Sequence, residues 1–304
     1  MKKIIILFSI VILSFSANAC EICGCGLGNY YIGIMPQFSH RFFGVRYQFS
    51  SYRTQLANDP TQFSKDFYQT VELWSGWNIG KRWQVLAFVP FNFNHQHSDE
   101  GIHTTSGSGD IAVLGNYKLL DNISKNGNNK TVSQQLWAGA GLKLPTGKFH
   151  IDPTDPDIAA AANSQIGSGS ADIILNAMYN IHISKLGISA NANYKINTTN
   201  KENYKFGNRA SVNSFIYYSI PAPAVKAVIT PNFGLLFQHS AANELQNNKV
   251  ALTGGNLLMA APGVEISFNK ITVGLNTQLP VAQNFAEGQT KLKAKGMLHI
   301  TFDL

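Results

Sequence analysis

Three cysteines near the start of the chain are spaced so that they could share a soft metal ion. Cys20, Cys23 and Cys25 stand within six residues and are the only 3 cysteines of the 304-residue sequence. Thiolates bind Cu(I) and Zn²⁺ well, so the cluster predicts a Cu or Zn site. The same spacing fits one disulfide with an odd thiol, or a lipid attached to Cys20. No second cluster completes a four-ligand site, and the three interpretations stay open.

Three histidines between positions 95 and 103 form a second candidate metal site. His95, His97 and His103 stand close to Asp99 and Glu100. Alternate residues of an extended chain project to the same side, so histidines two positions apart could share an ion. A solvated polar loop that carries histidines without binding metal is the alternative.

Charged residues also recur at alternate positions of long, otherwise apolar segments, which predicts one polar face along each segment. The residues that we assign to this face, as candidates for a solute path, are Arg46, Glu72, Arg82, Asp110, Lys143, Asp172, Lys195, Arg209, Lys293 and Lys295. Cations outnumber carboxylates in this set, so we expect the path to prefer anions. Asp110 and Asp172 follow long loops, and we expect them to pair with Lys143, Arg46 or other inward cations.

Twelve alternating segments must position these residues, and their length indicates strands that cross a membrane. A sandwich strand usually has about five to six residues, whereas a tilted membrane-spanning strand needs roughly nine to eleven. The segments cover about 41–51, 67–79, 82–94, 109–119, 134–144, 171–183, 186–196, 206–218, 224–237, 256–268, 270–280 and 291–302. Short and long connections alternate, as in outer-membrane barrels. The expected fold is all-β, an antiparallel transmembrane β-barrel of about twelve strands; a large soluble sandwich is the alternative.

The start of the chain predicts export from the cytoplasm. Lys2 and Lys3, an apolar stretch over 4–15 and the sequence Ala17-Asn18-Ala19 are typical of a cleaved signal peptide. No later apolar run reaches the roughly twenty residues of a transmembrane helix. We therefore expect a signal peptide over 1–19, a Cys-rich segment over 20–39 and a barrel over 40–304. The barrel should lie in the outer membrane of a Gram-negative bacterium, with long loops outside the cell and both termini in the periplasm.

Four motifs, in a fixed order, resemble one known family of proteins. They are Phe88-Val89-Pro90-Phe91, Gly107-Ser108-Gly109-Asp110-Ile111, Leu142-Lys143-Leu144-Pro145-Thr146-Gly147 and Gly167-Ser168-Gly169-Ser170-Ala171-Asp172-Ile173. The chain resembles, over roughly 40–304, the family named after the MetA pathway of phenol degradation. The resemblance implies an outer-membrane barrel that acts as a transporter, and it says little about the solute.

These observations lead us to expect passive transport of small solutes, either aromatic and apolar or anionic. A metal-handling protein that uses the cysteine cluster is the first alternative, and a structural barrel without transport is the second. We expect no enzyme: no nucleotide-binding loop is present, and the adjacent His239 and Ser240 do not match the spacing of outer-membrane phospholipase. The expected partners are outer-membrane lipid, the barrel insertion machinery and a small-molecule solute, with no nucleic acid. No cofactor is expected apart from the Cu or Zn above.

Overall fold

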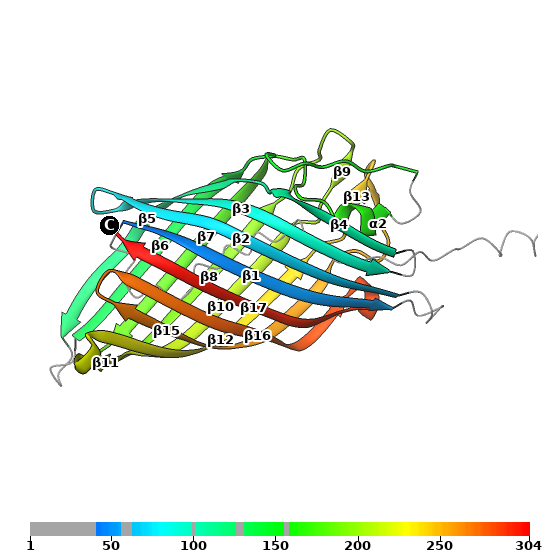
Figure 1. The fold of residues 1–304 in the computed structure, drawn as a ribbon. Helices are drawn as coiled ribbons and strands as arrows, with labels where there is room; N and C mark the ends of the chain where they lie inside the picture. The colour runs from blue at the N-terminus through cyan, green and yellow to red at the C-terminus, as the bar shows by residue number, and fades with distance from the viewer. Residues whose placement is uncertain (1–40, 56–62, 99–100, 126–130, 155–157) are drawn as a thin grey trace, which may run out of the picture.

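The structure, a computed structural model, describes residues 41–55, 63–98, 101–125, 131–154 and 158–304. The expected signal peptide, the segment over 20–39 and its cysteines Cys20, Cys23 and Cys25 lie outside these residues. Within them, the strands join edge to edge into a closed antiparallel barrel of twelve wall strands (Figure 1). The expected all-β fold class is confirmed. No helix in the described part of the chain is long and apolar enough to cross a membrane.

The wall strands follow one another around the barrel in sequence order. They are β1 (Phe42–Gln55), β2 (Phe63–Ile79), β3 (Trp83–Ser98), β5 (Ala112–Lys125), β6 (Thr131–Lys143), β7 (Asp172–Ile183), β8 (Leu186–Ile196), β10 (Arg209–Tyr218), β12 (Ala227–Ser240), β15 (Gly255–Phe268), β16 (Ile271–Phe285) and β17 (Thr290–Asp303). The ring closes where β1 pairs with β17, with Phe42 opposite Asp303 and Thr54 opposite Thr290. Closure pairs the backbone of every wall strand on both sides, as a lipid surrounding requires.

The two ends of the barrel differ in their connections, and we call them the turn end and the loop end. At the turn end, Gly80, Ser184 and Asn269 adopt positive φ angles in tight hairpins, and β10 reaches β12 through β11 (Ile220–Ala222) and η1 (Pro223–Val225). The loop end carries β4 (Gly101–Ser108), α2 (Ile158–Asn163), β9 (Tyr204–Lys205), β13 (Glu244–Leu245), β14 (Asn248–Lys249) and η2 (Ala286–Gly288). The C-terminus lies at the end opposite α2 and β9 (Figure 1).

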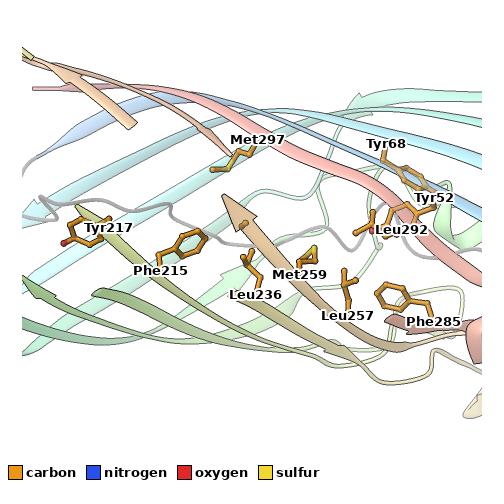
Figure 2. Packing of buried hydrophobic residues seen from close by; sticks show 11 residues of the cluster. Tyr52, Tyr68, Phe215, Tyr217, Leu236, Leu257, Met259, Phe285, Leu292 and Met297 are labelled. Atoms are coloured by element: carbon orange, nitrogen blue, oxygen red, sulfur yellow. The ribbon is translucent and has the colours of Figure 1, made fainter. Parts of the chain in front are cut away.

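Period-two alternation separates an apolar outer surface from the inner wall. Exposed outward residues include Phe43, Val45, Phe91, Phe93, Leu175, Ile188, Leu298 and Ile300. The inner wall mixes polar groups with two clusters of buried apolar side chains. Figure 2 shows the larger cluster extending inward, with Tyr52 and Tyr68 near Leu292, and Phe215, Leu236 and Met259 farther along the barrel.

Two of the expected inward residues do not lie on the inner wall. Lys293 is exposed because the pairing of β1 with β17 shifts between Ser51 and Tyr52, which leaves Lys293 as the extra residue of a β-bulge. Strict alternation assigned it to the interior, and this prediction was wrong. Arg82 is also exposed, because it belongs to the turn before β3, and its guanidinium donates to the hydroxyl of Tyr117 at 3.0 Å.

Candidate functional site

A buried polar cluster surrounds Lys143, where β6 ends at the loop end. Its ammonium group is 2.6 Å from Asp110 and 2.8 Å from Asp172, and both carboxylates are buried. The ammonium group also donates to the hydroxyl of Ser168 and to the backbone carbonyl of Ser170, which is 3.1 Å away. One cation between two carboxylates leaves excess negative charge, which needs further donors. We call these five residues the Lys143 cluster.

Backbone amides from two loops supply those donors. Asp110 accepts hydrogen bonds from the amides of Gly147 and Ser168, both at 2.9 Å. Asp172 accepts one from the amide of Thr198 at 3.0 Å. The Lys143 cluster therefore fastens both ends of the long loop between β6 and β7, together with the start of the loop after β8, to the wall. Both aspartates pair with Lys143. Lys143 is one of the cations that we expected as their partners from the sequence.

Two motif glycines allow the ends of this loop to close on the cluster. A Cβ on Gly147 would lie 2.7 Å from the Cα of Gly167, and one on Gly167 would lie 2.7 Å from a carboxylate oxygen of Asp110. Any larger residue would push the two loop ends apart. The Pro-Thr-Gly and Gly-Ser-Gly motifs thus form the backbone around the Lys143 cluster.

Arg46 forms a separate charged pair farther down the wall. It lies directly opposite Glu72 on the neighbouring strand, and the two side chains make a buried ion pair. The guanidinium carbon also lies 5.2 Å from the ring centre of Trp74 and 5.8 Å from that of Phe88. A cation over an aromatic face gains additional attraction when it is desolvated. The carboxylate beside Arg46 is thus Glu72, directly across the strand pair, rather than either aspartate of the Lys143 cluster.

Three further cations gather on the inner wall and form what we call the lumen cation group. Lys195 on β8 lies directly opposite Arg209 on β10. Lys295 projects inward from β17, within electrostatic range of Arg209. Each of the three is at least nine-tenths buried. The Nε of Arg209 donates a hydrogen bond to the hydroxyl of Ser240 over 3.2 Å. Like charges that converge inside a barrel favour the entry of an anion.

A row of side-chain amides lies on the same wall. Asn176 lies opposite Asn193, and Asn191 lies opposite Asn213. Among the described residues, neither amide atom of Asn116 or of Asn176 has a hydrogen-bond partner. Amides both donate and accept, so this row can bind water or polar solutes. The even spacing of asparagine in β7 and β8 is the sequence signal for this row.

The three histidines of the second candidate metal site do not come together. They lie in a hairpin of β3 and β4 that continues the wall beyond β5, where the sequence suggested a loop. His103 is paired with Gln96, so it lies on the face opposite His95 and His97. Across the described ranges, no group of three or more possible metal ligands is present.

His239 and Ser240, which are adjacent in the sequence, do not face the same way in the structure. The His239 ring nitrogen lies 2.8 Å from the amide oxygen of Asn256 on the adjacent strand. Ser240 instead bonds to Arg209 on the inner wall. The two side chains therefore point to opposite faces of β12.

A closed barrel with an apolar exterior and a charged, amide-bearing interior is the architecture of an outer-membrane β-barrel protein. The sequence matches the family described as "Putative MetA-pathway of phenol degradation" over residues 49–282, most of the chain, and the protein belongs to that family. This confirms the family expected from the motifs. No curated protein matches the sequence.

Two solved structures show the same kind of barrel. An outer membrane channel from Pseudomonas putida F1 is similar with a TM-score of 0.60 at 16% identity, over 87% of this chain and 96% of that chain. The β domain of the Bordetella autotransporter BrkA is similar with a TM-score of 0.50 at 9% identity, over 88% of this chain and 100% of that chain. At such low identity, the similarity concerns the fold alone.

Proposed function

We propose that this protein is a passive channel for small solutes across the outer membrane. The supporting observation is the polarity of its inner wall, which carries buried charges from Lys195 and Arg209 near the loop end to Glu265 near the turn end. Apolar residues could replace buried ion pairs at little cost or with a gain in stability. A barrel that served only as a scaffold would therefore have little need for buried charges on its inner wall. The protein from Pseudomonas putida F1 whose structure has a similar fold is described as an outer membrane channel.

The solutes that we propose are small anions with an aromatic or apolar part, and the residues of the inner wall are the basis for this choice. The lumen cation group offers positive charge from three strands. The same wall carries buried aromatic side chains, namely Trp74, Phe88, Trp137, Phe215 and Tyr217. Aromatic faces attract apolar rings, whereas the cations select the charge of the solute. No described contact favours metal handling, and the metal role of Cys20, Cys23 and Cys25 stays a prediction.

The proposed orientation puts the loop end outside the cell and the turn end, with the C-terminus, in the periplasm. The difference in connection length supports it, because outer-membrane barrels have short periplasmic turns and longer external loops. The C-terminal strand β17 carries Phe302 on its outer face. An aromatic residue near the end of such a strand is consistent with recognition by the barrel insertion machinery.

Conductance measurements test the proposed channel. The mature protein is reconstituted into planar bilayers with chloride or benzoate as the anion and a common cation, and benzyl alcohol serves as the uncharged counterpart. We expect discrete channel currents that benzoate alters more than benzyl alcohol does. The loop variant Lys205→Gln, whose charge lies outside the inner wall, should behave as the parent protein. Absence of current in repeated reconstitutions would contradict the channel and leave the structural barrel.

A further inference from the structure

Every turn-end connection whose strand ends are described carries a lysine or arginine at that rim. These residues are Arg41, Lys81, Arg82, Lys125, Lys185, Lys226 and Lys270, and all seven are exposed. Arg41 precedes β1, Lys81 and Arg82 lie between β2 and β3, and Lys125 ends β5. Lys185 lies between β7 and β8, Lys226 between η1 and β12, and Lys270 between β15 and β16. The cations therefore form a complete circle, which we call the turn-end cation ring.

Acidic residues do not neutralise this ring. The described turn-end segments hold three carboxylates against seven ring cations, namely those of Asp121, Asp303 and the last residue, Leu304, and Asp121 pairs with Lys118 rather than with a ring member. The loop end is different, because its exposed cations are mixed with acids. There Glu244 lies 3.2 Å from Lys205, and Asp152, Glu202 and Glu287 lie in the loops of the same end. The positive charge is thus concentrated at one rim of the barrel.

A belt of exposed aromatic residues fixes the depth at which the ring lies. Trp77, Trp83, Tyr218, Phe268 and Phe302 point outward within a few residues of the turn end. Trp and Tyr prefer the boundary between acyl chains and headgroups. The ring lies just beyond this belt, at the level of lipid phosphates. At one position the two features touch, because Arg82 donates to Tyr117, whose ring centre is 4.9 Å from that of Trp83.

We propose that the turn-end cation ring binds the phosphate groups of anionic glycerophospholipids in the leaflet that meets this end of the barrel. Lysine and arginine at an interface extend their charged ends toward headgroups while their aliphatic parts stay on apolar surface. A circle of such contacts selects anionic lipids around the whole rim and fixes the depth of the barrel. The inference does not depend on whether the barrel conducts.

Lipid selectivity in bilayers tests the ring. The folded protein is reconstituted into phosphatidylcholine containing a minority of spin-labelled phosphatidylglycerol, and the fraction of immobilised label gives the preference for the anionic lipid. The ring variant combines Lys81→Gln, Lys185→Gln, Lys226→Asn and Lys270→Gln; asparagine suits position 226, where φ is 49°. The matched control removes four exposed loop-end charges through Lys148→Gln, Lys201→Gln, Lys249→Gln and Lys291→Gln.

We expect the parent protein and the control to prefer phosphatidylglycerol, on the order of fivefold for each engaged headgroup, and the ring variant to lose most of this preference. The preference of the parent protein should also collapse at about 1 M salt, where screening acts within roughly 3 Å. This salt test needs no variant to fold. An equal preference in ring variant and parent, or an equal loss in the control, would overturn the proposal. Displacement of the labelled lipid by millimolar soluble glycerophosphate would also overturn it, in favour of a soluble anion.

Discussion

Lys143 and Arg46 show two ways of keeping a charge inside a barrel. Arg46 has one carboxylate directly across the strand pair and two aromatic faces beside it, and these three partners belong to the wall. Lys143 has two carboxylates that also hold loop amides, so its surroundings extend beyond the wall. The charge of Lys143 consequently stabilises a loop as well as a strand end.

Replacing Lys143 by methionine should destabilise the folded barrel strongly. The substitution leaves Asp110 and Asp172 facing each other without the cation, and breaking a buried ion pair in this way costs about 3–5 kcal/mol. The control Lys205→Met removes the partly exposed partner of Glu244 and should cost about 0–1 kcal/mol. Urea unfolding in lipid vesicles, followed by tryptophan fluorescence, measures both. Equal unfolding midpoints would show that the Lys143 cluster contributes no more than a surface pair.

Gly147→Ala should loosen the closure of the loop between β6 and β7. The new methyl group would lie 2.7 Å from the Cα of Gly167, so the backbone must move, at a cost of about 1–3 kcal/mol. The control is Gly115→Ala on β5, where the nearest atom to the new methyl group is 3.9 Å away. We expect faster protease cleavage between β6 and β7 in the first variant and parent-like cleavage in the second. Identical cleavage rates would contradict the close packing of the two glycines.

At the scale of the elements, alternation predicted the wall strands well because lipid and the barrel interior impose opposite chemistry on successive residues. The same rule assigned Lys195, Arg209 and Lys295 to the inner wall, where the structure has them. It failed where the backbone leaves the regular pleat. The bulge at Lys293 and the turn at Arg82 depend on pairing with a distant strand and on turn geometry, and neither is visible as a local pattern.

Cysteine labelling can test the bulge in β17. Lys293→Cys and Lys295→Cys stand two residues apart, so strict alternation would give them the same face and similar reactivity. The structure exposes position 293 and buries position 295, where the side chain is 3% exposed. In a background with Cys20, Cys23 and Cys25 replaced by serine, a maleimide added to the folded protein should label position 293 much faster. Equal labelling rates would contradict the bulge.

The candidate site was less predictable than the strands. The positions of Asp110 and Asp172 after long loops suggested Lys143 or Arg46 as partners, and the structure selects Lys143. The pairing of Arg46 with Glu72 depends on the register between β1 and β2, and the sequence does not specify that register. The β3–β4 hairpin also depends on register, which is why His103 lies on the face opposite His95.

At the scale of the whole molecule, the charge of the inner wall is nearly balanced in number but uneven in position. The buried cations are Arg46, Lys118, Lys143, Lys195, Arg209 and Lys295, and the buried carboxylates are Asp66, Glu72, Asp110, Asp172 and Glu265. Six against five gives a surplus of one positive charge within the described residues. With Arg82 and Lys293 outside the inner wall, the surplus is smaller than the sequence suggested. The ion preference of the channel must therefore come from where the charges lie.

Removing the lumen cation group should reverse the ion preference of the channel. The variant Lys195→Gln, Arg209→Gln and Lys295→Gln changes the buried count from six cations and five carboxylates to three and five, so the surplus becomes two negative charges. The parent protein should prefer anions modestly, because buried cations outnumber buried carboxylates by one and three of these cations lie on β8, β10 and β17. Reversal potentials under a salt gradient in planar bilayers measure the ion preference of both proteins.

The loop-end variant Lys148→Gln, Lys201→Gln and Lys249→Gln removes the same charge from exposed positions and should keep the parent preference. A shift of equal size in both variants would show that overall charge, and not the lumen cation group, sets the selectivity.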